Sequence, residues 1–455
     1  MRPRLTALLL LACTPLAAAS APARPNVLLL LADDLGASDL PVYGNAFHET
    51  PHLDRLAREG LRFTQFYAGP VCSPTRANLQ SGQDQARFGI TQHIPGHRRP
   101  YARLRDPQVP DQLPLEVVTF AEVLRAAGYA TGYFGKWHLG GAGFGPREQG
   151  WETAEEFQGH TRDGGRAAAH LADRAIEFLR QPRSGPFLLQ LSFYAVHIPL
   201  TTTPELLAKY QAKPPRPPYP SRPEYAGLLE ELDTAIGRVL AELDRRGLAD
   251  NTVVWFLSDN GGLEHEQSGR IVTSNAPLRG EKGSLYEGGV RIPALVRWPG
   301  RVPAGAVSAT PAITHDLHPT LVVLAGATAP AGQPRDGEDL GPVLARPDTP
   351  RTNDTLYWHL PHYHHSTPAS AVRRGPWKLI EFLEDGRLEL YNLRDDIGES
   401  RNLAAERPEK TRELYERLVA WRTSVQAPMP TKNTDPAAPP APKKKGGKKR
   451  ANSEK

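Results

Sequence analysis

The segment around Cys72 holds residue types that could carry out nucleophilic chemistry. It reads Cys72-Ser73-Pro74-Thr75-Arg76. Ser73 is a favourable N-cap residue and Pro74 suits the first helical position, so the pattern predicts a helix that begins here. Backbone N–H groups without partners in the first turn of a helix favour anions. Cys72 is therefore a candidate catalytic residue beside an anion site, although most free cysteines are buried and inert.

Polar residues follow the ends of several apolar runs that predict buried strands. These residues are Asp33, Asp34, Lys136, His138, His197, Asp259 and Asn260. Ligands of open α/β sheets bind at the carboxyl ends of the strands, so we expect these side chains to meet. The Asp and Asn side chains offer oxygen ligands only, which select Ca²⁺ or Mg²⁺ over zinc. Each motif alone is usually a turn or a solvated loop, so the metal site is predicted from their combination.

The elements that must position these residues alternate along most of the chain. Continuous apolar runs predict strands at residues 26–32, 130–134, 186–193 and 252–257. Helical periodicity predicts helices at 118–127, 167–180 and 225–246. This alternation indicates an α/β fold with a mainly parallel sheet and helices on both faces. We expect the corresponding catalytic domain to cover residues 24–345.

The pattern changes after about residue 345. Short strands are predicted at 356–359, 371–373, 377–380 and 388–392, followed by a helix at 409–424. They predict a small α+β subdomain over residues 346–425, made of an antiparallel sheet with one covering helix. Residues 426–455 are rich in Pro, Ala, Lys and Gly, and seven of the last thirteen are basic. We expect a disordered basic tail there, which either binds polyanions or only increases solubility.

The N-terminus resembles an export signal. A basic start at Arg2 and Arg4 precedes an apolar run and then small residues, so residues 1–23 are predicted to be a signal peptide. A disordered hydrophobic N-terminus is the alternative. We expect a secreted or periplasmic protein with no transmembrane segment, and Cys13 also fits a lipoprotein cleavage box that would give a lipid anchor. The net charge of +5 is weak grounds for nucleic-acid binding, and none is expected.

Several motifs in a fixed order make the sequence similar to the type I sulfatases of the alkaline phosphatase superfamily. Besides Cys72 to Arg76, they are Pro25-Asn26-Val27 through Asp33-Asp34-Leu35-Gly36, Gly135-Lys136-Trp137-His138-Leu139-Gly140, Val196-His197-Ile198-Pro199, Ser258-Asp259-Asn260-Gly261-Gly262 and Leu278-Arg279-Gly280-Glu281-Lys282. The resemblance runs from about residue 24 to residue 403. It implies an alkaline-phosphatase-like fold and a sulfuric ester hydrolase.

The resemblance also implies a set of site residues and cofactors. The implied catalytic residues are Cys72, Arg76, Lys136, His138, His197 and Lys282, and the implied ligands of Ca²⁺, with Mg²⁺ as the alternative, are Asp33, Asp34, Cys72, Asp259 and Asn260. Cys72 would be oxidised to formylglycine (3-oxoalanine) by a formylglycine-generating enzyme or a radical maturase. One hydroxyl of the hydrated aldehyde would attack sulfur with help from Asp259. His197 or Lys282 would protonate the leaving alcohol, and His138 would then take a proton from the second hydroxyl so that sulfate leaves.

Two features of the sequence depart from the family pattern. Gln80 and Ser81 stand where the family has an apolar residue and commonly a threonine, and Phe134 replaces a smaller residue. None of the three takes part in the implied chemistry directly.

The substrate is predicted from weaker signals. Arg98 and Arg99 lie in a basic stretch, and His362 and His364 lie in the predicted small subdomain, so these four are candidates for binding a sulfated saccharide. A solvated loop is the alternative for both stretches. A phosphomonoesterase or phosphonate hydrolase of the same superfamily is the nearest rival function, but it would need a Thr or Ser nucleophile and two transition metals. A non-catalytic polyanion-binding protein with an unconverted cysteine is the rival from another class.

Overall fold

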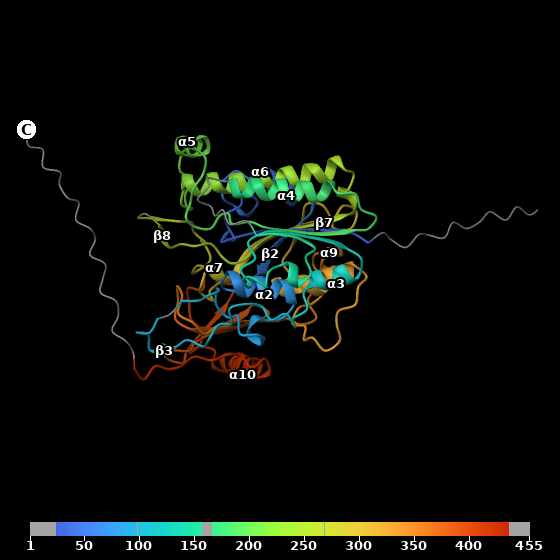
Figure 1. Ribbon diagram of the computed structural model, residues 1–455. Helices are drawn as coiled ribbons and strands as arrows, with labels where there is room; N and C mark the ends of the chain where they lie inside the picture. The colour runs from blue at the N-terminus through green and yellow to red at the C-terminus, as the bar shows by residue number, and fades with distance from the viewer. Residues whose placement is uncertain (1–23, 98, 157–165, 268, 436–455) are drawn as a thin grey trace, which may run out of the picture.

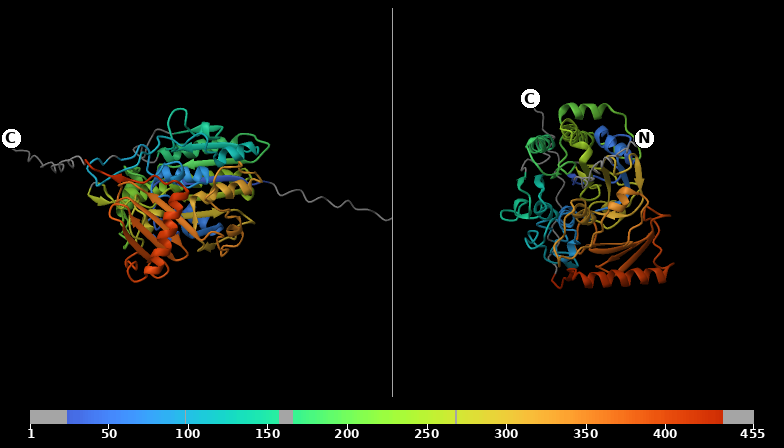
Figure 2. Two further views of the ribbon diagram at one scale, coloured as in Figure 1. Left: turned by 90° about the horizontal axis from the view of Figure 1, so that it is seen from below. Right: turned by 90° about the vertical axis from the view of Figure 1, so that its right-hand side faces the viewer.

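The computed structural model describes residues 24–97, 99–156, 166–267 and 269–435 (Figures 1 and 2). The predicted signal peptide at 1–23 with Cys13, the candidate substrate residue Arg98, and residues 436–455 lie outside the described residues. Within the described part, no helix combines the length and the apolar character that a membrane crossing requires.

A nine-stranded sheet forms the centre of the molecule. Its order is β11 (Ala306–Ser308), β2 (Leu61–Tyr67), β10 (Arg291–Arg297), β7 (Thr252–Ser258), β1 (Asn26–Ala32), β6 (Phe187–Ser192), β4 (Ala130–Gly135) and β5 (Thr153–Glu155), with β12 (Ala312–Ile313) paired to β2. Neighbouring strands are parallel except that β10 is antiparallel to both β2 and β7. The predicted mainly parallel sheet is therefore confirmed.

Helices cover both faces of this sheet (Figure 1). One face carries α1 (Pro51–Glu59), α4 (Arg166–Arg180), α5 (Pro204–Ala212) and α6 (Pro223–Arg245), and the other carries α2 (Cys72–Ser81), α3 (Phe120–Ala126), α8 (Leu317–Leu324) and α9 (Gly341–Ala345). Strand β1 shows why both faces must be covered. Leu28 packs in the core beneath the first group of helices, while Leu29 packs in the core beneath the second. Successive side chains of a strand point to opposite faces, so an unbroken apolar run requires two cores.

A second sheet lies beside the first. Its strands β13 (Thr355–Leu360), β14 (Ala369–Arg374), β15 (Trp377–Phe382) and β16 (Arg387–Asn392) are antiparallel, and α10 (Pro408–Ser424) covers one face. The opposite face packs on the main body, where Trp358 shares a core with Tyr67 and its Nε1 donates to the Ala68 carbonyl at 2.9 Å. This confirms the predicted antiparallel sheet with one helix. The division into domains at residue 345 stays a prediction.

Short elements complete the fold. They are α7 (Glu287–Val290), the pairs β3 (Leu104–Arg105) with β17 (Thr431–Lys432) and β8 (Glu266–Gln267) with β9 (Arg270–Ile271), and 3₁₀ turns at Pro41–Tyr43, Gln85–Arg87, Arg147–Gln149, Ala249–Asn251 and Thr314–Asp316. All the predicted strands and helices are present, with ends that differ by at most two residues. Strands β2 and β10 were not predicted.

Two local predictions were wrong. Helix α2 begins at Cys72 with Val71 as its N-cap, so Ser73 is not the cap. Its hydroxyl instead donates to the His138 carbonyl at 2.9 Å and accepts from the Ile94 amide at 3.1 Å. The first ten residues of the predicted disordered tail, 426–435, are ordered, because β17 pairs with β3 and Asn433 bonds to that loop.

Candidate active site

The predicted site residues meet at the carboxyl ends of the central strands. Asp33 and Asp34 directly follow β1, Asp259 and Asn260 directly follow β7, and Lys136 directly follows β4. Strands β1 and β7 are paired through their last residues, Ala32 opposite Ser258, so their two acidic segments lie side by side. This arrangement confirms that parallel strands bring these side chains to one edge of the sheet.

Cys72 is the first residue of helix α2, and its side chain is buried. Its Sγ–H donates to Asp33 Oδ1 at 3.5 Å. Burial raises the pKa of the Cys72 thiol to about 12, and the charge of Asp259 raises it further against the opposing effect of Lys136. The thiol is therefore neutral near pH 7. Since the thiolate is the reactive form of cysteine, unmodified Cys72 is a poor nucleophile in this site.

Three carboxylates cluster around Cys72. One ligand atom from each of Asp33, Asp34, Asp259 and Cys72 lies within 4.8 Å of the others. Asn260 belongs to the same cluster because its Nδ2 donates to Asp34 Oδ1 at 2.8 Å.

The cluster fits a hard divalent cation. Within the described part of the chain, two of its buried oxygens have no hydrogen-bond partner, Asp34 Oδ2 and Asn260 Oδ1. A buried oxygen without a hydrogen-bond partner lowers the free energy of unfolding, and a bound cation would remove that loss. The three aspartates and Asn260 offer only oxygen ligands, which suit Ca²⁺ or Mg²⁺.

Each carboxylate of the cluster is paired with a cation, of which Arg76 and Lys282 are buried and Lys136 is 13% exposed. Lys136 Nζ lies 2.5 Å from Asp33 Oδ2, and Lys282 Nζ lies 2.7 Å from Asp34 Oδ1. Arg76 donates through Nε and a terminal nitrogen to Asp259 Oδ2, at 3.1 and 2.8 Å.

These pairs set the charge states of the site. Burial opposes ionisation of Asp33, but the charges of Lys136 and His197 outweigh it and hold its pKa well below the usual range. Burial opposes protonation of Lys282, yet the charge of Asp34 raises its pKa well above the usual range. Burial and the charge of Asp33 together raise the pKa of Asp259. Positive groups are thus fixed in a site shielded from water, where they stabilise developing negative charge most strongly.

The two predicted histidines have defined tautomers. His138 Nε2 lies 2.7 Å from the Ile94 carbonyl, which can only accept, so Nε2 carries the proton and Nδ1 carries the lone pair. Burial lowers the pKa of His138 to about 3, with a further contribution from Lys136, so the ring is neutral. His197 Nδ1 likewise donates to the Ile198 carbonyl at 2.5 Å, which leaves its Nε2 at 3.6 Å from Asp34 Oδ2. Each histidine therefore presents one basic nitrogen.

A cavity of about 630 Å³ opens onto these residues. It is lined by Asp33, Asp34, Cys72, His93, His97, Lys136, His138, Glu156, Tyr194, His197, Ile198, Pro199, Leu263, His265, Lys282, His364 and His365. Sequence reasoning missed His93, His265, Glu156 and Tyr194 as site residues. They lie on irregular connections, where no periodicity shows which way a side chain points. The spacing of four between His93 and His97 was the one available signal.

Of the predicted substrate residues that the structure describes, only one lines the cavity. His364 lines the cavity. Arg99 does not line it and instead donates to the His364 carbonyl at 2.8 Å. The prediction for His362 was wrong, because its side chain is only 1% exposed and its Nε2 is bonded to Thr91 Oγ1 at 2.8 Å. A helix or strand pattern would have been needed to show that this loop residue points inward.

The departures from the family pattern have structural partners. Gln80 is buried at the underside of α2, and its Nε2 donates to Gln190 Oε1 on β6 at 3.0 Å. Ser81 Oγ donates to the Ala77 carbonyl at 2.7 Å. Phe134 packs edge-on against Phe178 of α4, with ring centroids 6.3 Å apart. None of these three residues lines the cavity.

Comparison with known families decides the family of this chain. The family model for sulfatases matches residues 25–327, which is two thirds of the chain. The protein belongs to the sulfatase family. A second model, the C-terminal region of N-sulphoglucosamine sulphohydrolase, matches residues 280–424 and so includes the second sheet. This sulfatase has the alkaline-phosphatase-like fold of its family.

Individual relatives of this sulfatase carry different names. Steryl-sulfatase of Mus musculus is 34% identical over 77% of this chain and 70% of its own. N-acetylgalactosamine-6-sulfatase of Homo sapiens is 36% identical over 72% of this chain and 67% of its own. The crystal structure of Ps i-CgsB in complex with k-i-k-neocarrahexaose superposes with a TM-score of 0.76 at 25% identity, covering 89% of this chain and 94% of that one.

Proposed function

We propose that this sulfatase removes sulfate from a sulfated carbohydrate, with a formylglycine nucleophile made from Cys72 and a divalent cation, Ca²⁺, held by Asp33, Asp34, Asp259 and Asn260. One observation carries the proposal. A neutral, buried cysteine occupies the first turn of a helix, between three carboxylates and their three cations.

Formylglycine at position 72 would supply a hydrated carbonyl whose oxygen attacks sulfur. As it stands, the thiol of Cys72 has a raised pKa and is a poor nucleophile, which supports conversion before catalysis. The cation would polarise oxygen atoms at residue 72 and on the sulfate group. Ca²⁺ is favoured over zinc because the four side chains that would hold it offer only oxygen ligands.

The chain's own residues would handle protons and charge. Asp259 can accept a proton from the nucleophile, since its pKa is raised by burial and by Asp33. His138 holds a free lone pair on Nδ1 and would act as a base, while His197 or Lys282 would protonate the leaving oxygen. Lys136 and Arg76 would stabilise the charge that develops on the sulfate oxygens.

The lining of the cavity favours a saccharide over a sterol. Apart from Ile198, Pro199 and Leu263, the lining residues in the described part of the chain are titratable. A sterol body would leave the ring nitrogens of His93, His97 and His364 without partners, whereas a saccharide offers hydroxyl groups to bond with them. His364 is part of this polar wall. The name N-acetylgalactosamine-6-sulfatase and the complex with k-i-k-neocarrahexaose agree with this choice, whereas the name steryl-sulfatase favours the sterol.

We further propose that the protein works outside the cytoplasm, as the predicted signal at residues 1–23 indicates. Maturation of Cys72 would then require a formylglycine-generating enzyme or a radical maturase during synthesis.

The chemical state of residue 72 tests the mechanism. The chain is co-expressed with a formylglycine-generating enzyme, digested with trypsin, and the fragment 63–76 is weighed by mass spectrometry. We expect the mass of the aldehyde or its hydrate, and sulfate release that chelator abolishes and Ca²⁺ restores. Cys72→Ala is the matched inactive control. Unmodified cysteine, in cells that convert a control sulfatase, would contradict the mechanism.

The substrate class needs a separate assay. Ion chromatography measures the sulfate released from a set of sulfated mono- and oligosaccharides and from a steryl sulfate, and the phosphate released from a phosphate monoester. We expect kcat/KM for the best saccharide to exceed that for the steryl sulfate by at least about tenfold. A preference for the steryl sulfate would overturn the saccharide assignment and leave the mechanism intact.

A further inference from the structure

We propose that His93, His97 and His364 form a second metal site, which binds a divalent transition-metal ion such as Zn²⁺ in the wall of the active-site cavity. This site uses nitrogen ligands and is separate from the oxygen cluster around Cys72. It does not depend on the function proposed above.

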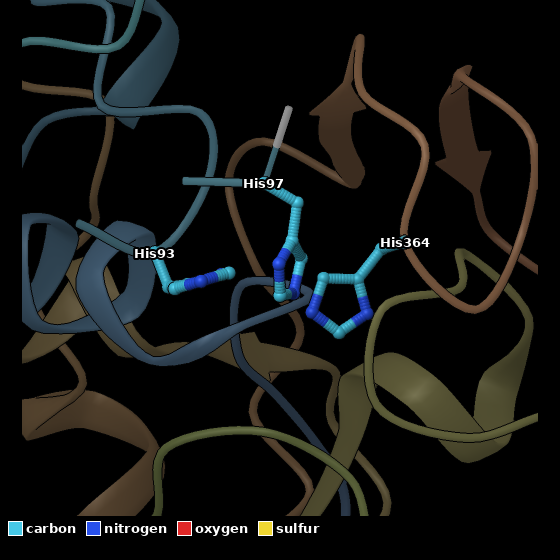
Figure 3. Close-up of side chains that lie close together, drawn as sticks. All are labelled: His93, His97 and His364. Atoms are coloured by element: carbon cyan, nitrogen blue, oxygen red, sulfur yellow. The ribbon is translucent and has the colours of Figure 1, made fainter. Parts of the chain in front are cut away.

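The three rings converge from two distant parts of the chain (Figure 3). His93 and His97 lie on the connection that leads to β3, and His364 lies on the connection between β13 and β14. The ring centroids are 4.4 Å apart for His93 and His97, 5.3 Å for His97 and His364, and 5.7 Å for His93 and His364. Figure 3 shows a ring nitrogen of His97 and one of His364 facing each other.

These distances are close to those of a three-histidine metal centre. One ring nitrogen from each residue lies within 4.8 Å of the other two. With Zn–N bonds of about 2.1 Å, two nitrogens on a tetrahedral ion lie about 3.4 Å apart. The nitrogens would therefore approach one another by at most about 1.4 Å, which side-chain rotations on irregular connections can supply.

The ring nitrogens of this trio are free to coordinate. Within the described residues, none of them has a hydrogen-bond partner, and His364 Nδ1 is also buried. Other histidines around the cavity differ. His138, His197 and His365 each direct a ring nitrogen to a backbone carbonyl, at 2.7, 2.5 and 2.8 Å. The buried Nδ1 of His364 lowers stability unless a ligand bonds to it, whereas His97 is exposed and can bond to water.

The charge state of the trio suits a metal ion. Burial lowers the pKa of His93 to about 4 and that of His364 to about 2, and it also lowers the pKa of His97. All three rings are therefore neutral near pH 7, as metal ligands must be. The positive charge of Lys282 also lowers the pKa of all three rings, although this lysine is paired with a carboxylate of the oxygen cluster.

The ligand type selects the ion. Three imidazoles without a carboxylate suit Zn²⁺, Cu²⁺ or Ni²⁺ and are poor ligands for Ca²⁺. Three-histidine centres keep a fourth position for water. Because His93 and His138 have ring centroids 6.4 Å apart, an ion here would lie beside the proposed base.

The test is a calorimetric titration of the purified protein, with residue 72 left as cysteine or converted, with Zn²⁺ in saturating Ca²⁺, so that Ca²⁺ competes for the oxygen cluster. We expect one Zn²⁺ site in the micromolar range or tighter. His97→Ala, whose side chain is exposed in the native protein, should weaken that site at least tenfold, and so should His364→Ala. His265→Ala removes a histidine that lines the same cavity outside the trio and should keep the site.

A second, spectroscopic measurement distinguishes the loss of metal ligands from misfolding of a variant. Co²⁺ bound to the native enzyme should give the intense visible bands of a four-coordinate ion with nitrogen ligands, and His97→Ala should lose them while its thermal unfolding is unchanged. Absence of a tight site, or equal Zn²⁺ affinity in the native enzyme and in His97→Ala, would overturn the proposal. Neither readout requires formylglycine or turnover, so failure here is distinct from failure of the proposed sulfatase mechanism.

Discussion

At the scale of single residues, the site is a set of buried ion pairs that a divalent cation would complete. Asp33 is paired with Lys136 and Asp34 with Lys282, and both pairs are shielded from water. Removing one partner of a buried pair leaves a charge uncompensated, which costs far more than the loss of an exposed pair. The same pairs hold the positive groups in place for a sulfate ester.

Lys136→Met tests this view of the site. Asp33 would lose its partner, so we expect the free energy of unfolding in chelator to fall by about 3–5 kcal/mol. In Ca²⁺ the loss should be smaller, because a bound cation compensates the same carboxylate. Urea unfolding with and without Ca²⁺ measures both values.

The control for this variant is Lys410→Met. Lys410 forms a more exposed pair with Glu413, so its removal should cost less than about 1 kcal/mol in either condition. An equal loss for Lys136→Met with and without Ca²⁺ would argue against a cation at Asp33.

His138→Ala tests the assignment of the base. His138 is neutral because its pKa lies at about 3, so it can accept a proton at any pH well above that value. We expect kcat for sulfate release to fall by roughly 10²- to 10⁴-fold, with a smaller change in KM. His52→Ala, on α1 and outside the cavity, is the matched control. A kcat within a few fold of the native value would remove His138 from the mechanism.

At the scale of elements, helix α2 depends on a polar contact with the sheet beneath it. The Gln80 amide donates to Gln190, and the Gln190 amide donates to Ser192 Oγ at 3.0 Å. Tyr133 joins the same group through Ser192 at 2.9 Å and donates to the Lys136 carbonyl at 2.6 Å. A chain of bonds therefore runs from the helix that carries Cys72 to the backbone of a proposed catalytic lysine.

A double-mutant cycle between Gln80 and Gln190 measures this contact. Gln80→Leu leaves Gln190 Oε1 buried without its donor, so we expect each single Leu variant to lose about 1–3 kcal/mol of unfolding free energy. The double variant should lose less than the sum, by roughly 1 kcal/mol, as chemical denaturation would show. Strictly additive losses would mean that the two amides do not interact in solution.

At the scale of the whole molecule, residues 426–435 contact two parts of the chain that are distant in sequence, the segment around β3 and strand β13. β17 pairs with β3, and Asn433 Nδ2 donates to the carbonyls of Pro100 and Ala102, both at 2.9 Å. On the other side, His359 of β13 bonds the Pro428 carbonyl through Nε2 at 2.8 Å. This segment connects the second sheet to the loop that follows His97 in the chain.

Two truncations test that role. Deleting residues 426–455 removes several hydrogen bonds worth about 1 kcal/mol each, so we expect a loss of roughly 2–4 kcal/mol of unfolding free energy. Amide exchange at residues 99–105 should become faster. Deleting only 436–455, whose composition predicts a disordered basic tail, should change stability by less than about 0.5 kcal/mol. Equal stability of the two truncated chains would contradict the proposed connection.

The sequence by itself determined the class of fold and which polar residues meet at the carboxyl ends of the central strands. Residues 27–32 are apolar at every position, and an apolar run this short indicates a strand buried on both faces. The polar residues that follow such strands lie at one edge of a parallel sheet. These inferences are local or depend on one general rule, so they survive without coordinates. The reaction proposed for the site was inferred from the motifs around Cys72 that resemble those of the family.

Only the tertiary structure decided what surrounds that centre. His93, His97 and His364 lie on irregular connections, and no periodicity in the sequence reveals that they converge or that neighbouring His362 points inward. The antiparallel strand β10 and the ordered segment 426–435 likewise depend on partners that are distant in the chain. Such contacts form because the packed body brings the segments together, and the physical information that specifies them is spread over the whole fold.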